Sequence, residues 1–292
     1  MPSSKFQKTI FPCRNPQRRF GADFFVSLFQ GANPSRAFYA SATDIDRTYR
    51  YEPAALKHMG LEAFTHELKK IPRGSVLGFD QNPDCYGMKE ESQNMRKVLA
   101  AIQEAGMGLF METGSENIVH DTDILVSIQE QAPLLIAVPI GFSNEAVGEK
   151  MDPSEPGFVS KIRLIRRLSQ EKIKTGIIIK PIIPFVNDSE ENLLKILAKA
   201  IEAGAVFVYP SFGIIVDDRQ RPGFYELLEN QFPGLRNIYM DTFGQKESLV
   251  SVNAAKLKKS FVFAAKKMHV DFGMKDIIKS YKPSSGTQMK LF

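Results

Sequence analysis

The chain alternates short apolar runs with longer segments of mixed polarity from about residue 22 onward. Near-continuous apolar runs are typical of strands that are covered on both faces. Their alternation with amphipathic segments predicts repeated β-α units around a parallel sheet, and therefore an α/β fold. The expected strands are 24–29, 75–79, 108–113, 134–140, 176–182 and 205–210, with a short seventh candidate at 237–240.

The segments between these runs carry signals for where helices start and stop. Asp188 is expected to cap the helix that follows it, with Glu191 three residues later as in a capping box. Gly204 then ends that helix, and Gly106 likewise ends a helix over 91–105. The order of the units favours an incomplete barrel of six β-α units.

The chain is long enough, at 292 residues, to bury the core of a large α/β domain. We expect a basic N-terminal arm over 1–20, a barrel over 21–250, and C-terminal helices and a tail over 251–292 packed on the barrel. The two cysteines, Cys13 and Cys85, indicate a reducing compartment rather than a disulfide framework. No run approaches the roughly 20 apolar residues of a membrane helix, so we expect a cytoplasmic protein without a membrane partner.

The segment Gly31–Ser41 follows the first expected strand. It resembles the iron–sulfur loop of radical S-adenosylmethionine (SAM) enzymes, in which a C-x3-C-x2-C motif supplies three thiolates to a [4Fe–4S] cluster. Ala32, Arg36 and Tyr39 stand at the corresponding positions. None of the three side chains is a good ligand for cluster iron, which prefers thiolate sulfur. We therefore expect no [4Fe–4S] cluster.

The resemblance extends along the chain. The sequence as a whole resembles the spore photoproduct lyase-like branch of the radical SAM superfamily, in particular its small bacterial members. This resemblance implies a partial (β/α)6 TIM-like barrel of the radical SAM type, with ligands at the carboxyl ends of the strands. Landmarks that follow the family order are 20–24, Thr113 with Ser115, Asp121 with Asp123, 181–188, 212–213, 220–221, 224–225 and 232–235.

Departures from the family pattern concentrate where the cofactors would lie. Gly114 stands for an expected lysine, His120 for an arginine, and Asp152 for the glutamate of a Glu-Pro pair. A metal site of another kind is an alternative, because Asp80, Asp84, Glu112, Glu116, His120 and Asp121 all fall near the ends of the second and third expected strands. Helix capping and a polar mouth explain the same residues without a metal. We expect no metal and no catalytic residue. The candidate residues of the barrel mouth are Asp80, Glu112, Ser115, His120, Asp152 and Lys180.

The sequence thus predicts a radical SAM-like pseudoenzyme that acts as a binding or regulatory protein, with an active relative as its protein partner. One alternative is an enzyme of altered chemistry that still binds SAM or another nucleotide. Another is a nucleic-acid-binding protein, because basic clusters could contact phosphates and aromatic rings could stack on bases. Those clusters and rings are Arg163, Arg166, Arg167, Lys258, Lys259, Lys266, Lys267, Phe38, Tyr39, Tyr49 and Tyr51.

Overall fold

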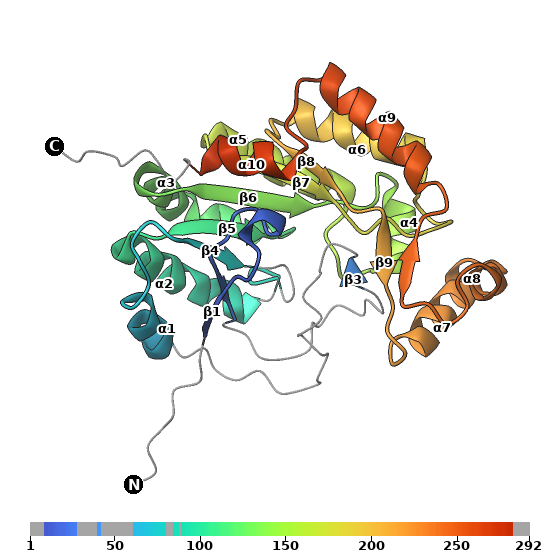
Figure 1. Ribbon diagram of the computed structural model, residues 1–292, viewed down its shortest axis with the longest axis horizontal. Helices are drawn as coiled ribbons and strands as arrows, with labels where there is room; N and C mark the ends of the chain where they lie inside the picture. Colours follow the sequence, from blue (N-terminus) through green and yellow to red (C-terminus); the bar gives the residue numbers. More distant parts are fainter. Residues whose placement is uncertain (1–8, 28–39, 42–60, 80–83, 88, 283–292) are drawn as a thin grey trace, which may run out of the picture.

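The computed structural model describes residues 9–27, 40–41, 61–79, 84–87 and 89–282. Within this part of the chain, a central sheet has the strand order β1-β2-β4-β5-β6-β7-β8 (Figure 1). Neighbours from β2 to β8 are parallel, and β1 pairs antiparallel with β2 at the edge. The strands are β1 (Ile10–Pro12), β2 (Phe24–Val26), β4 (Val76–Phe79), β5 (Gly108–Glu112), β6 (Leu134–Pro139), β7 (Thr175–Ile179) and β8 (Val208–Pro210).

Helices cover one face of this sheet and bury the larger core against it. Alternate strand residues such as Leu109, Ile136 and Ile177 belong to that core, together with apolar helix residues such as Leu164 and Phe261. This arrangement confirms the predicted partial (β/α)6 barrel. The covering helices are α1 (Leu61–Leu68), α2 (Lys89–Ala105), α3 (Thr122–Gln131), α5 (Phe158–Gln170), α6 (Glu190–Glu202) and α9 (Ala254–Lys267).

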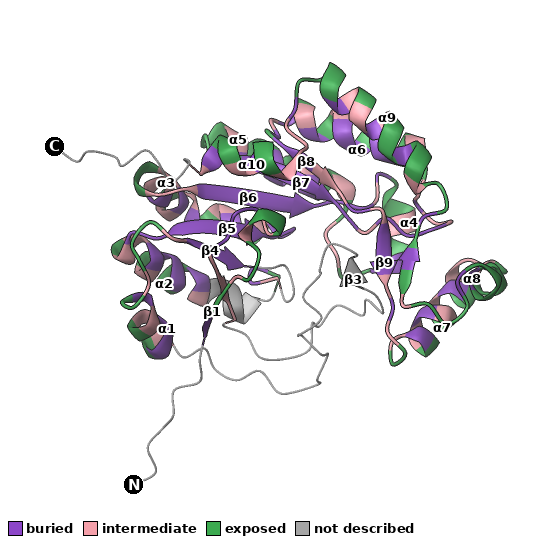
Figure 2. Cartoon of the chain, viewed as in Figure 1, coloured by how far each residue is buried: buried purple, intermediate pink, exposed green. Residues whose placement is uncertain are grey.

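The other, concave face of the sheet holds a smaller aromatic core. Phe110 stacks on Phe20, with ring centroids 4.7 Å apart, and Phe207 packs at 5.9 Å from Phe20. Helix α10 (Met274–Tyr281) closes this core with Ile277 and Tyr281. Figure 2 shows the central strands β4 to β7 as buried. The basic arm expected over 1–20 contains β1 and a 3₁₀ helix, η1 (Pro16–Arg18). Phe20, at the end of this arm, packs on the concave face.

An appendage with its own core is built mainly from segments after β8, with β3 and α4 from earlier in the chain. An antiparallel sheet runs in the order β10-β9-β3. The bounds are β3 (Ala40–Ser41), β9 (Gly213–Ile215), β10 (Ser248–Val250), α4 (Glu145–Met151), α7 (Arg221–Gln231) and α8 (Leu235–Phe243). The strand predicted at 237–240 is wrong, because these residues lie in α8. Gly234 enters that helix with φ 88°, and Tyr239 and Phe243 are buried one turn apart.

The sequence signals predicted where the helices end, but they named the wrong capping residue for one helix. Gly204 has φ +103° and Gly106 has φ +65°, as expected for glycines that end helices. The cap of α6, however, is Ser189, whose hydroxyl accepts a hydrogen bond from the Asn192 amide at 3.1 Å. Asp188 instead accepts bonds from the Phe185 amide and the Ser251 hydroxyl. Among the described residues, no helix is long and apolar enough to cross a bilayer.

Candidate functional site

The site lies at the carboxyl ends of β5 and β7, on the concave face of the sheet. Side chains alternate between the faces of a strand, so Glu112 shares a face with Phe110, and Lys180 with Ile178. The Lys180 ammonium lies 2.7 Å from the Glu112 carboxylate. Both side chains are buried, with 5% and 8% of their surface exposed.

A second pair of the same composition lies beside the first. Lys161, in the first turns of α5, places its ammonium 2.8 Å from the Glu155 carboxylate. The Lys161 side chain crosses Gly114, where a Cβ atom would lie only 3.0 Å from the Lys161 Cε. The pKa of Glu155 is held below its usual value, first by Lys161 and further by Lys180. Electrostatics therefore joins the two pairs into one cluster, the mouth cluster, of Glu112, Glu155, Lys161 and Lys180.

Asp84 ties together the loops that follow β4 and β5. Its carboxylate accepts hydrogen bonds from the backbone amides of Tyr86 and Gly114, both at 2.9 Å, and from the Thr113 hydroxyl at 2.8 Å. Burial raises the pKa of Asp84 above its usual value, while the amide bonds act in the opposite direction. Asp84 thus fixes the backbone on which Gly114 makes room for Lys161.

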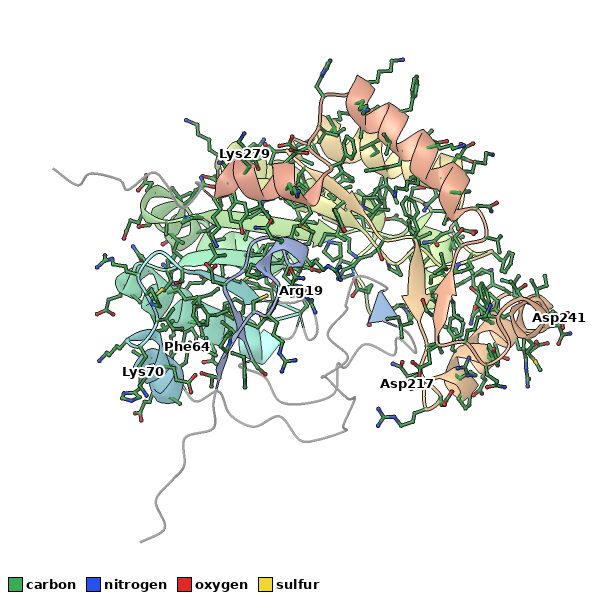
Figure 3. The ribbon with its side chains drawn as sticks, in the orientation of Figure 1. Arg19, Phe64, Lys70, Asp217, Asp241 and Lys279 are labelled. Atoms are coloured by element: carbon green, nitrogen blue, oxygen red, sulfur yellow. The ribbon has the colours of Figure 1, made fainter. Side chains whose placement is uncertain are left out.

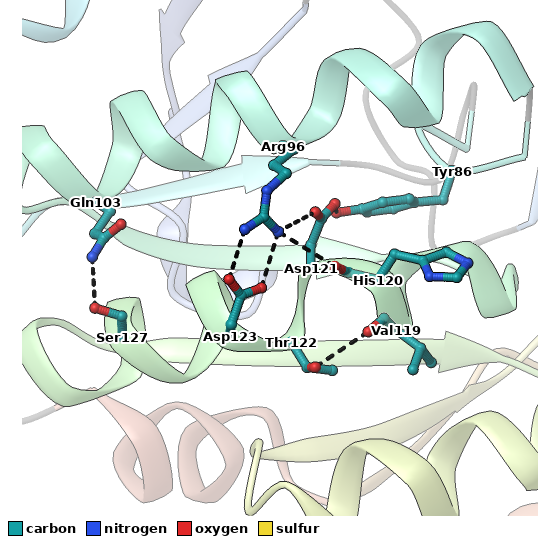
Figure 4. A network of polar contacts seen from close by, with 9 residues as sticks. All are labelled: Tyr86, Arg96, Gln103, Val119, His120, Asp121, Thr122, Asp123 and Ser127. Atoms are coloured by element: carbon teal, nitrogen blue, oxygen red, sulfur yellow. Dashed lines mark hydrogen bonds and ion pairs between the residues drawn. The ribbon is translucent and has the colours of Figure 1, made fainter.

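A polar network next to these loops fixes α2 against the start of α3 (Figure 4). The buried Tyr86 hydroxyl donates to the Asp121 carboxylate at 2.7 Å. Arg96, on α2, donates to Asp121 at 3.1 Å and to both oxygens of Asp123, at 3.0 and 2.7 Å. Burial, and then the charge of Asp121, raise the pKa of Tyr86 far above its usual value. With every polar end engaged, this network supports the mouth loops.

Of the five predicted mouth residues that the structure describes, it brings Glu112 and Lys180 together. Ser115 caps the 3₁₀ helix η2 (Glu116–Asp121), and its hydroxyl donates to the Tyr86 carbonyl at 2.9 Å. The exposed His120 ring projects away from Asp121 (Figure 4). Asp152 accepts bonds from the Ser154 amide and hydroxyl in its own turn. Asp80 and the three degenerate cluster positions, Ala32, Arg36 and Tyr39, lie outside the described residues.

Sequence analysis missed Glu155 and Lys161, half of the mouth cluster. The one available signal was Gly114, a glycine at a position where the family pattern expects lysine. The structure shows that an ammonium group is still present at this place, supplied by α5 rather than by the strand end.

The acidic residues weighed for a metal are otherwise engaged. Glu116 accepts a bond from the Ser160 hydroxyl at 2.8 Å and lies 3.4 Å from Arg163, while Asp121 pairs with Tyr86 and Arg96. In the part of the chain that the structure describes, no three histidine, cysteine or acidic residues form a group suited to a metal ion. The charges of the mouth cluster are paired with one another, Lys180 with Glu112 and Lys161 with Glu155.

Comparison with known sequences finds distant relatives of unknown activity. No protein-family model matches the chain. An uncharacterized protein of Mycobacterium tuberculosis is 22% identical over 180 residues, which are 61% of this chain and 53% of that protein. An uncharacterized protein of Acidianus two-tailed virus is 24% identical over 149 residues, 49% of this chain and 48% of that protein. The chain thus spans about half the length of the curated relatives it matches.

Comparison with solved structures defines the fold as that of the radical SAM partial barrels. A mutant of spore photoproduct lyase superposes with a TM-score of 0.64 and 13% identity, over 90% of this chain and 78% of that chain. Another mutant, with bound AdoMet and dinucleoside spore photoproduct, gives 0.62 at 12% identity, over 91% and 78%. At such identities the likeness concerns the fold.

Proposed function

We propose that this chain is a radical SAM-like protein without the iron–sulfur cluster, and that it works as a binding or regulatory protein rather than as a radical enzyme. The observation that carries the proposal is the number of cysteine thiolates available to bind iron. A site-differentiated [4Fe–4S] cluster needs three thiolates, and the full sequence contains only Cys13 and Cys85. Cys13, which follows β1, and the buried Cys85 both lie outside the segment Gly31–Ser41 that resembles the cluster motif. The residues present do not fit the cluster.

The partner in this proposal is another protein, an active relative of the same barrel type. A barrel that keeps its packing without its redox centre can bind such a relative and control it without chemistry of its own. The well-packed core and the hydrogen-bonded mouth loops are consistent with this function, because together they keep the surface of the barrel in a fixed shape.

Iron content tests the proposal directly. Protein reconstituted anaerobically with iron and sulfide is expected to bind much less than one cluster per chain. Any residual iron is expected to disappear in a Cys13→Ser/Cys85→Ser variant, since two thiolates can hold adventitious iron. Four irons per chain with the absorption of a [4Fe–4S] cluster would overturn the proposal.

The mouth cluster favours a second candidate function, SAM binding without radical cleavage. Lys161 and Lys180 would hold the carboxylate of SAM, and Glu112 and Glu155 would hold its ammonium group. When bound, SAM supplies an electrophilic sulfonium centre. The four side chains contribute charge complementarity and exclude water, because three of them are almost fully buried.

Calorimetric titration of the purified protein with SAM separates the two candidates. If SAM binds, Lys161→Met should weaken it at least tenfold, because a charge-assisted hydrogen bond contributes about 1.5–3 kcal/mol. The matched control, Lys97→Gln on the exposed side of α2, should leave binding unchanged. Absence of heat at two temperatures would refute SAM binding and leave the cluster-free binding protein as the function.

A further inference from the structure

Helix α9 carries an unusual concentration of positive charge on the outside of the molecule. Between Ser248 and Val270 the sequence has no acidic residue. All five lysines of this segment are exposed: Lys256, Lys258, Lys259, Lys266 and Lys267. Figure 1 shows α9 on the outer rim of the molecule, packed on α6. The charge of α9 therefore serves neither the core nor the mouth.

Four of these lysines surround an exposed aromatic ring. With 3.6 residues per turn, Lys256, Lys259, Phe263, Lys266 and Lys267 all fall within about 100° of the helix circumference. We call this set the α9 stripe. Phe263 lies between the two lysine pairs and is 73% exposed, the highest value among the large apolar residues that the structure describes. A single exposed apolar side chain is ordinary on a protein surface; what distinguishes Phe263 is the four exposed lysines around it.

The inward side of α9 is already occupied. Leu257, Phe261 and Ala265 are buried in the main core. On the α6 side, Glu190 accepts a bond from Ser260 and lies 3.2 Å from Lys256, whose side chain is still 71% exposed. One acidic residue therefore touches the stripe at its end, and the centre around Phe263 remains basic and apolar.

We propose that the α9 stripe docks the protein on a bilayer that contains anionic phospholipids. A flat anionic surface can meet all four lysines of a helix on a convex rim at once, and each lysine near such a surface contributes about 1 kcal/mol. Phe263 then enters the interface between headgroups and acyl chains, as aromatic residues of peripheral helices do. The expectation of no membrane partner rested on the lack of a spanning segment, which peripheral docking does not need.

Two other occupants fit the stripe less well. In a symmetric contact with a second copy, the same lysines would face each other and repel. Single-stranded nucleic acid is held in a basic groove with several aromatic platforms, whereas the stripe is a convex helix face with one ring. The bilayer is the occupant that uses both the charge and the exposed ring.

Vesicle sedimentation with the full chain tests this proposal. We expect binding to phosphatidylcholine vesicles that contain about one third phosphatidylserine, and little binding to pure phosphatidylcholine. Lys259→Gln/Lys266→Gln should lower the partition coefficient by about 25-fold, since each lysine contributes about fivefold. Phe263→Ser should lower it by roughly tenfold, and Phe263→Leu should restore most of this loss.

The matched control removes the same charge elsewhere. Lys69→Gln/Lys70→Gln changes two exposed lysines after α1, and Lys70 lies on the side of the molecule opposite α9 (Figure 3). This variant should bind vesicles within about threefold of the unchanged protein, because distant charges are screened. An equal loss in both double variants, or equal binding to neutral vesicles, would overturn the proposal. The proposal would also be overturned if the protein bound single- or double-stranded oligonucleotides through the α9 stripe and did not bind vesicles.

Discussion

The concave interior of the barrel has two layers of opposite character. The lower layer is aromatic, with Phe110 and Phe207 both packed on Phe20 under α10. The upper layer lies two residues further along the strands, toward the mouth. It holds the ion pair of Glu112 and Lys180. Apolar burial stabilises a fold, whereas a buried ion pair contributes little or even costs stability compared with apolar residues of the same volume. The difference teaches that the lower layer maintains the barrel, whereas the upper layer contributes little to stability, in line with the binding role proposed for it.

Truncation in the lower layer should have the largest effect. Phe110→Ala removes a ring that is 2% exposed and stacked on Phe20, so we expect a loss of about 4 kcal/mol in the free energy of unfolding. Urea unfolding followed by circular dichroism measures it. Phe110→Leu should cost clearly less. A loss below about 1 kcal/mol for the alanine variant would contradict a well-packed aromatic layer.

The upper layer should respond differently to single and double substitution. Lys180→Met leaves the buried Glu112 carboxylate without its ammonium partner, and we expect a loss of about 3 kcal/mol. Glu112→Met/Lys180→Met removes both charges and should recover most of that loss. Denaturation of the three proteins gives the comparison. If the double variant were as unstable as the single one, the pair would contribute to folding in the same way as the aromatic layer.

The network that supports the mouth loops should give a smaller effect. Tyr86→Phe removes one buried hydrogen bond to the Asp121 carboxylate and keeps the ring in place. We expect a loss of about 1.5 kcal/mol, since a bond to a charged acceptor is worth somewhat more than a neutral one. Thermal unfolding measures it. An unchanged melting temperature would show that Arg96 alone holds Asp121.

The smallest effect concerns pH and the more exposed pair. The pKa of Glu155 is lowered from 4.5 by Lys161, so its contribution to stability is present above pH 4.5 and is lost as the pH falls through the folded-state pKa. Glu155→Gln should therefore be destabilised at neutral pH and equal to the unchanged protein at acid pH. Because 35% of the Glu155 side chain is exposed, we expect less than about 1 kcal/mol. A difference between the two proteins that grows toward acid pH would contradict the lowered pKa.

The barrel was predictable because its signals are local. Apolar runs marked every parallel strand of the main sheet, although most proved shorter than expected, and Gly106 and Gly204 marked helix ends. Ser189 was missed as a cap because Asp188 beside it is an equally good capping residue type. The appended strands β3, β9 and β10 are two or three residues long and pair across the chain, so no local period announces them.

The site was less predictable because it depends on packing between elements far apart in the sequence. Glu112 and Lys180 follow from strand alternation and the common mouth of a parallel barrel. Glu155 and Lys161 do not, because nothing in the α5 pattern shows that Lys161 turns inward across Gly114. His120 was a reasonable candidate by type, but the turn of η2 carries its ring to the surface.

The clasp between the two ends of the described chain has a consequence for synthesis. The Tyr281 hydroxyl donates to the Phe20 carbonyl, and the Lys282 ammonium bonds the Gly21 carbonyl and the Asp23 carboxylate. A ribosome releases Phe20 long before it releases α10. Throughout translation the rings of the lower layer therefore remain open on the side that α10 will cover. The nascent barrel depends on helix α10 to hide an aromatic surface that would otherwise attract chaperones or other chains.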